Sequence, residues 1–160
     1  MVFRKAKRQD ISAIIAMLAD DDLGKLREDF HDPLPEKYYQ AFANIDGDPN
    51  QELMVVENEK QEVIGTFQMS FIPYLTYQGG IRAQIEAVRI RKDVRGQGLG
   101  EKMFRWAIQR AQERKAHLLQ LTTDKKRPDA FRFYENLGFK ATHEGMKLHF
   151  DPLVSLASDS

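Results

Sequence analysis

The sequence contains no cysteine, which excludes disulfide bonds, thiolate nucleophiles and cysteine-ligated metal sites. It also lacks an apolar run long enough to cross a membrane, and residues 1–8 lack the apolar segment of a signal peptide. The length of 160 residues suits one domain with a sizeable core. We therefore expect a single cytoplasmic domain over residues 1–150 and a polar tail at 151–160, with no membrane partner.

The formal net charge is zero, because 24 basic side chains balance 24 acidic ones. The two halves differ, since residues 1–80 carry 8 basic and 14 acidic side chains and residues 81–160 carry 16 and 10. The basic half suits an anionic ligand and the acidic half a cationic amine, unless the surface charge is merely uneven along the chain. With zero net charge and no nucleic-acid-binding motif, we expect no nucleic-acid partner.

Glycine is sparse, with ten residues, but three of them fall within Val88–Gly100, which reads V-R-I-R-K-D-V-R-G-Q-G-L-G. The alternating Val88 and Ile90 predict a strand, and the amphipathic pattern after Leu99 predicts a helix. Glycines let backbone N–H groups approach a ligand, and the start of the helix adds unpaired donors and a positive dipole end. This junction predicts a site for an anion, most commonly a phosphate, with which Arg95 can pair.

The spacing of the glycine loop excludes two common phosphate-binding motifs. Gly100 is followed by Glu101-Lys102-Met103 rather than by the Lys-Ser/Thr of a Walker A loop, and Glu101 stands where the dinucleotide fingerprint needs a glycine. The sequence R-G-Q-G-L-G instead resembles the R/Q-x-x-G-x-G/A motif of the GNAT superfamily of acyl-CoA-dependent N-acetyltransferases. Thr122–Phe139 resembles the closing segment of that family, with Phe-Tyr followed by Leu-Gly-Phe. The resemblance covers most of the chain.

The order of the predicted elements is β-α-α-β-β-β-α-β-α-β, an α/β (α+β) arrangement that is also the GNAT order. The resemblance implies a mixed, mostly antiparallel central sheet of six to seven strands with about four helices. We expect loops at 25–35 and 73–80. The predicted strands are 2–5, 52–57, 62–71, 81–90, a buried strand at 118–121 and a last strand at 142–150. The predicted helices run from Asp10 to about Ala19, from Pro35 to Asp46, from Leu99 past Ala111, and from Pro128 to Gly138.

The resemblance also implies where acetyl-CoA binds. The strand before the glycine loop separates from its neighbour in this family, and its freed backbone groups hold the pantetheine and the acetyl carbonyl. Here those groups belong to Glu86, Ala87, Val88 and Ile90. The pyrophosphate then contacts Arg95, Gly96, Gln97, Gly98, Leu99 and Gly100. Arg127 is placed to bind the 3′-phosphate, although its run of three adjacent cations is also typical of a solvated turn.

Two side chains are candidates for catalysis. Tyr134 matches the tyrosine that protonates the leaving thiolate in many family members, and the alternative is a tyrosine that only packs in its helix. Glu86 is the candidate base, and a period of two places it on the same face as Val88 and Ile90. Glu86 has two alternatives: it binds a cationic substrate, or it pairs structurally with Arg82 or Arg89.

These features predict an N-acetyltransferase that transfers the acetyl group of acetyl-CoA to a primary amine of a small molecule or protein. Without a cysteine or a Ser-His-Asp arrangement, direct attack in a ternary complex is the simplest mechanism, and no metal is required. The alternative is a non-catalytic acyl-CoA sensor with the same fold. Family members are often dimers, so a homodimer is compatible with the resemblance. The acceptor is expected near residues 23–35, Tyr38, Tyr39 and residues 73–80, where aromatic rings and the acidic Glu28, Asp29 and Asp32 suit a cationic amine.

Overall fold

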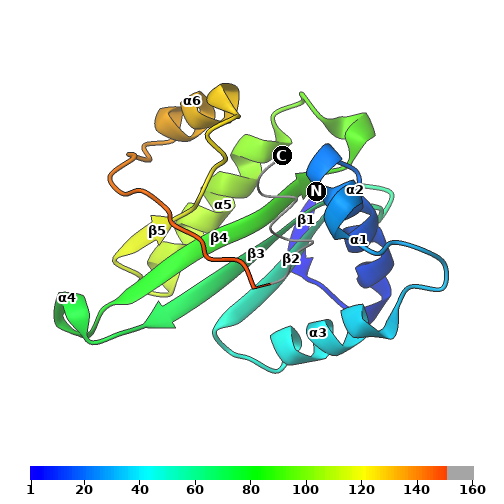
Figure 1. Cartoon of the computed structure of the whole chain (residues 1–160), viewed down its shortest axis with the longest axis horizontal. Coiled ribbons are helices and arrows are strands. Elements are labelled where there is room, and N and C mark those ends of the chain that lie inside the picture. The colour runs from blue at the N-terminus through cyan, green and yellow to red at the C-terminus, as the bar shows by residue number, and fades with distance from the viewer. Residues whose placement is uncertain (151–160) are drawn as a thin grey trace.

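The computed structural model describes residues 1–150, and its centre is a mixed sheet of five strands (Figure 1). The strands lie side by side in chain order, and the first four pair antiparallel with their neighbours. The fifth strand pairs parallel with the fourth, as a crossover helix requires. The strands are β1 (Val2–Lys5), β2 (Gln51–Glu57), β3 (Val63–Pro73), β4 (Ile81–Ile90) and β5 (Leu118–Gln120).

Helices cover both faces of this sheet (Figure 1). The N-terminal helices pack on one face, and the long crossover helix packs on the other. The helices are α1 (Ile11–Ala19), α2 (Asp22–Arg27), α3 (Glu36–Asp46), α4 (Thr76–Gly79), α5 (Leu99–Glu113) and α6 (Pro128–Asn136), with 3-10 turns at Arg8–Asp10 and Lys92–Val94. Within residues 1–150, none of them combines the length and the apolar character that a membrane span needs.

The alternation of side chains along β2 divides the core into two layers. Met54 and Val56 pack with the α5 side chains in the larger layer, together with Phe67 of β3. Val55 points the other way and packs with Ile14 and other α1 side chains. The central strands are therefore buried on both faces, which fixes their register.

A carboxylate is buried beside the larger layer. Glu52, in β2, is 3% exposed in its side chain and accepts hydrogen bonds from Arg110 Nη2 at 2.6 Å and Arg110 Nε at 2.9 Å. Arg114 Nη1 lies 3.3 Å from the same carboxylate. Arg110 is on α5 and Arg114 is its C-cap residue, so these ion pairs attach the crossover helix to β2.

The sheet is smaller than the six to seven strands that the resemblance implies. Residues 142–150, predicted as a last strand, form no strand. Met146, Leu148 and Phe150 alternate as expected, but they are 95%, 81% and 92% exposed, because no neighbouring strand or helix covers them. β5 is a partly exposed edge strand, not a buried one. The predicted tail at 151–160 lies outside the described residues.

The described part of the chain also contains six helices where about four were predicted. α2 begins before residue 25 and extends into the predicted loop, since the Asp21 side chain accepts a hydrogen bond from Gly24 N and caps the helix. α4 is a short turn within the predicted loop at 73–80. The predicted strands at β1 to β4 and the helices α1, α3, α5 and α6 are confirmed.

Candidate functional site

A bulge in β4 is the central irregularity of the candidate site. Thr66 and Gln68 of β3 pair with Arg89 and Glu86 of β4, so that two residues of β4 oppose one of β3. Ala87 is one of the two and has a left-handed φ of 55°. The bulge shifts the alternation of side chains by one position for the rest of the strand.

This shift overturns the predicted position of the Glu86 side chain. Val88 and Ile90 pack against the core layer that contains α5, whereas Glu86 is exposed on the opposite face. Arg89 shares the face of Glu86, because their partners Thr66 and Gln68 are two residues apart on β3. The simple period of two was wrong here, since it took no account of the bulge.

β4 separates from β5 close to the bulge. The pairing with β5 covers only Arg82–Gln84, so residues 85–90 of β4 have no β5 partner. The edge of β4 that faces β5 therefore leaves backbone groups available around Ala87 and Val88. Backbone groups along an unpaired strand edge can hydrogen-bond an amide or a carbonyl of an extended ligand.

The glycine loop follows the end of β4 and leads into α5. Gly96 and Gly98 have φ of 77° and 81°, and a Cβ on either would meet no other atom within 4 Å. Gly98 is the N-cap of α5, whose first-turn N–H groups and positive dipole end are consequently exposed at the loop. Arg95 Nε donates to Ile90 O at 3.0 Å, and Nη2 lies 3.4 Å from Asp20, so this side chain lies along the end of β4.

Gly100 shows how closely the loop approaches the neighbouring elements. A Cβ on Gly100 would lie 3.5 Å from Ile90 Cδ1 and 3.8 Å from Phe133 Cζ. The start of α5 therefore contacts both the end of β4 and α6. This packing places the helix that carries Tyr134 next to the glycine loop.

Tyr134 is half-buried in an aromatic cluster. Its ring lies 5.4 Å from that of Phe104 and 6.1 Å from that of Phe139 in edge-on geometry. Burial raises the pKa of the Tyr134 phenol, and the positive charges of Arg127 and Arg89 oppose that rise. The phenol is consequently protonated at neutral pH and lies in the electric field of two guanidinium groups.

Arg89 was considered from the sequence only as a structural partner of Glu86, but in the structure it pairs with Asp21. Its guanidinium is mostly buried, and this burial lowers its pKa, with Arg27 and Arg127 adding repulsion. Arg89 Nε lies 3.2 Å from Asp21 Oδ2, and Nη1 donates to Val88 O at 2.9 Å. Asp21 and Arg89 are far apart in sequence, so no local pattern indicates this contact.

Polar side chains continue along the face that carries Glu86. Gln84 Nε2 lies 3.4 Å from Glu86 Oε1, and Gln120 Nε2 donates to Gln84 Oε1 at 2.8 Å. Gln68, the cross-strand partner of Glu86, donates to Gln51 Oε1 at 2.9 Å. Among the described residues, Glu86 forms no ion pair with Arg82, Arg89 or any other arginine, so the structural pairing considered from the sequence is not observed.

Two of the three acidic side chains in the predicted acceptor loop, Glu28 and Asp29, form ion pairs within the chain. Asp29 pairs with Lys37 at 2.8 Å, and Glu28 pairs with Arg27 at 3.2 Å. Tyr38 joins the two, because its hydroxyl accepts from Asp29 N and donates to Glu28. Tyr38 and this loop lie together as predicted. The carboxylates of Glu28 and Asp29, however, already pair with cationic side chains of the same chain.

Other predicted acceptor residues lie elsewhere or contact different groups. The Tyr39 ring is covered by the Arg8 guanidinium, 4.1 Å from the ring centroid. Tyr74 lies under Arg82 and hydrogen-bonds His117 at the opposite end of β4 from the glycine loop. This aromatic group is therefore not part of the site around the bulge.

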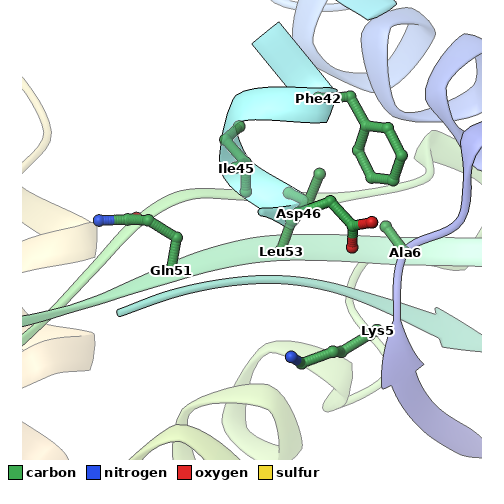
Figure 2. A pocket seen from close by; sticks show the side chains of 7 residues that line it. All are labelled: Lys5, Ala6, Phe42, Ile45, Asp46, Gln51 and Leu53. Atoms are coloured by element: carbon green, nitrogen blue, oxygen red, sulfur yellow. The ribbon is translucent and has the colours of Figure 1, made fainter. Parts of the chain in front are cut away.

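A small cavity lies between α3 and the first two strands, away from the site (Figure 2). Its volume of about 10 Å³ holds roughly one water molecule. It is lined by Lys5, Ala6, Phe42, Ile45, Asp46, Gln51 and Leu53, none of which is a predicted site residue. In residues 1–150, no three histidine, aspartate or glutamate side chains come together as metal ligands would.

Comparisons with known proteins agree with this geometry. The chain is 33% identical over 110 residues to the aminoalkylphosphonate N-acetyltransferase of Salmonella typhimurium, covering 66% of this chain and 70% of the relative. A structure named as a transcriptional regulator from Bacillus halodurans is 54% identical with a TM-score of 0.89, covering 93% of this chain and 99% of that one. A predicted acetyltransferase from Clostridium acetobutylicum, with acetyl-CoA, is 25% identical with a TM-score of 0.69, covering 92% and 95%.

The family model named Acetyltransferase (GNAT) family matches residues 21–139. The match includes the bulge in β4, the glycine loop, α5 and α6, and it spans most of the chain. The chain belongs to the GNAT acetyltransferase family.

Proposed function

We propose that this protein is an N-acetyltransferase that uses acetyl-CoA as donor and a primary amine of a small molecule or protein as acceptor. The observation that carries the proposal is the opening of β4 away from β5 beside the glycine-capped start of α5. The membership in the GNAT family supports an acetyl-CoA donor, and the name of the Salmonella relative supports an amine acceptor.

We assign the predicted cofactor residues to this opening. Ala87, Val88 and Ile90 provide backbone groups for the pantetheine and the acetyl carbonyl. The first-turn N–H groups of α5 hold the pyrophosphate together with the loop before them, through Arg95, Gly96, Gln97, Gly98, Leu99 and Gly100. Arg127 supplies positive charge for the 3′-phosphate.

The chain's own residues then carry the proton transfers of a direct attack. Acetyl-CoA, when bound, supplies the acetyl group as a thioester. Glu86 accepts a proton from the amine nitrogen, directly or through water, as that nitrogen bonds to the carbonyl carbon. Backbone N–H groups at the bulge stabilise the negative charge on the carbonyl oxygen. Tyr134 donates its phenolic proton to the thiolate as the C–S bond breaks, and solvent returns a proton to the phenolate.

Titration calorimetry with acetyl-CoA, followed by a free-thiol release assay over a panel of amines, tests the proposal. We expect saturable binding at one site per chain and thiol release with one class of acceptor. The absence of acetyl-CoA binding would refute the assignment of the glycine loop, because that loop is the main anion site of the proposal.

A second candidate function is an acyl-CoA sensor without turnover. The name of the 54% identical Bacillus halodurans structure, a transcriptional regulator, favours it. A sensor binds acetyl-CoA but releases no thiol with any acceptor, and its ligand affinity does not depend on Glu86 or Tyr134. The same calorimetry and thiol assay therefore separate the two functions.

A further inference from the structure

The bulge at Ala87 creates a pair of opposite charges on one face of the sheet. Without the bulge, Glu86 and Arg89 would point to opposite faces, since they are three residues apart. With it, their cross-strand partners are Gln68 and Thr66, so the two side chains occupy successive positions on the same face. Successive same-face positions of a strand are about 7 Å apart. A carboxylate and a guanidinium therefore face one small region beside the opening of β4.

Arg89 is set up to receive an anion there. Its Nε lies 3.2 Å from Asp21 Oδ2 and its Nη1 donates to Val88 O, whereas its Nη2 forms no hydrogen bond with the described residues and the side chain is 21% exposed. A ligand oxygen can accept a charge-assisted hydrogen bond from this free Nη2. Guanidinium groups match carboxylates and phosphates in geometry as well as charge.

The surroundings of Arg89 add further positive charge. Arg27 and Arg127 lie near enough for their charges to act on Arg89, against the carboxylates of Asp21 and Glu28. Three cations thus face two anions, and Glu28 is already held by Arg27 and Tyr38. The charge balance of this cluster favours an added anion over an added cation.

We propose that the acceptor is a small amine that also carries an acidic group, namely a carboxylate, phosphate or phosphonate, a few bonds from its nitrogen. Arg89 binds the acidic group, with Arg27 beside it, while the amine lies near Glu86 and the bulge. This inference rests on the proposed acetyltransferase function and specifies its substrate class. Glu86 then binds the amine end of the acceptor and Arg89 binds its acidic end, because the bulge brings these two positions of β4 onto one face.

Paired acceptors test this directly with the intact protein. In the thiol-release assay, 2-aminoethylphosphonate, phosphoethanolamine and β-alanine are compared with ethanolamine, propylamine and 1,3-diaminopropane. We expect kcat/KM to favour the acid-bearing amines by about 10- to 100-fold, the usual value of a charged hydrogen bond. The three acid-bearing amines show which acidic group fits best. A preference for the amines without an acidic group would overturn the inference.

Arg89→Gln shows whether the preference comes from this guanidinium. We expect the KM of the acid-bearing amines to rise by about tenfold or more relative to the KM of the other amines, whatever change in kcat the two classes share. Arg89→Lys should restore part of the preference, since it keeps the charge. Arg105→Gln is the matched control, because Arg105 pairs with Glu101 on the exposed face of α5.

The possible failures are distinct. An equal loss for both acceptor classes in Arg89→Gln would assign Arg89 only a structural role with Asp21 and overturn the inference. If Arg89→Gln fails to fold, Arg89→Lys and the wild-type acceptor comparison still test whether the acceptor carries an acidic group. Thiol release with amines that lack an acidic group, and with no others, overturns this inference but leaves the acetyltransferase function intact. No thiol release with any amine, despite acetyl-CoA binding, overturns both.

Discussion

Tyr134 shows how one side chain can be suited to a proton transfer by its surroundings. Burial raises the pKa of its phenol, and the charges of Arg127 and Arg89 act in the opposite direction. The aromatic packing against Phe104 and Phe139 limits the movement of the ring. A phenol that remains protonated through neutral pH, and that lies next to the glycine loop, suits the donation of a proton to a thiolate.

We expect Tyr134→Phe to lower kcat by about 100-fold, the lower range for the loss of a general acid. Because its raised pKa keeps the phenol protonated, its contribution is present below that pKa and is lost as pH rises through it. The alkaline decline of the wild-type rate should therefore be absent from the variant. Calorimetry controls for binding, and unchanged turnover with unchanged acetyl-CoA affinity would show that Tyr134 only packs.

Glu52 is important for stability rather than for the site. Burial raises the pKa of its carboxyl, but Arg110 and then Arg114 lower it more, so the net shift is downward. A carboxylate with a lowered pKa stabilises the fold above its unfolded value, near about 4.3, and loses that contribution as pH falls through the folded pKa. The ion pairs of Glu52 therefore stabilise the attachment of α5 at neutral pH.

We expect Glu52→Gln to lower the free energy of unfolding by about 3 kcal/mol at pH 7, because it leaves two arginines without their buried partner. At pH 3 the difference from the wild type should shrink, since this pH lies below the unfolded pKa and the contribution of the lowered folded pKa is then being lost. Urea unfolding at both pH values measures this. Glu113→Gln is the control, because that exposed carboxylate pairs with the same Arg110 and should change stability by less than about 1 kcal/mol. Equal losses for the two variants would contradict the argument.

At the scale of the element, the start of α5 combines two glycines with different requirements. Gly98 needs a left-handed φ of 81°, although a Cβ there would meet nothing. Gly100 lies inside the helix, where a Cβ would meet Ile90 and Phe133 at ordinary contact distance. The first glycine is thus required by the backbone, and the second is not.

We expect Gly98→Ala to destabilise the protein by about 1–2 kcal/mol, the cost of a left-handed conformation for an L-residue. It should also weaken acetyl-CoA binding, since the N–H groups of the loop shift. Gly100→Ala should leave stability unchanged or raise it by up to about 1 kcal/mol, because alanine favours a helix. Thermal unfolding and calorimetry of both variants measure these effects. A larger loss of stability in Gly100→Ala than in Gly98→Ala would show that packing, not φ, governs the loop.

The elements that could be predicted from the sequence are those with a strong local period. The helical spacing after Leu99 and the alternating runs at 52–57 and 81–90 each identify an element without reference to the rest of the chain. The same reasoning failed at 142–150, because a strand also needs a partner to cover its apolar face. It missed α2 because the Asp21 cap looks like the end of the preceding helix.

The site was predicted in part for the same reason. The glycine loop and Tyr134 belong to local motifs, so their neighbourhood in the fold was foreseeable. The bulge at Ala87 depends on the register of two strands, and one inserted residue reverses the face of Glu86. The contact between Asp21 and Arg89 joins distant parts of the chain, as does the pairing of Glu52 with α5. Such contacts arise from the tertiary structure and produce no periodic pattern in the local sequence.

At the scale of the whole molecule, the proposed donor site joins β4, α5 and α6, which come from the basic half of the sequence. A ligand that binds only the folded chain stabilises it by mass action, by about 2.7 kcal/mol at 100 times its Kd. For a chain of this size, that corresponds to a rise in Tm of roughly 5–10 °C. Acetyl-CoA should therefore produce a large thermal shift that keeps rising with the logarithm of its concentration above Kd.

The ligand-induced rise in Tm also tests the predicted role of Arg127. Dephospho-CoA lacks the 3′-phosphate, so it should raise Tm less than CoA at equal concentration if Arg127 binds that phosphate. In Arg127→Gln the two ligands should give equal shifts, and the shift with CoA should decrease to that with dephospho-CoA. Raising the salt concentration should narrow the wild-type difference, since exposed charge pairs are screened. Equal shifts for the two ligands in the wild type would mean that Arg127 does not bind the 3′-phosphate, and would leave its charge to act on Tyr134 and Arg89.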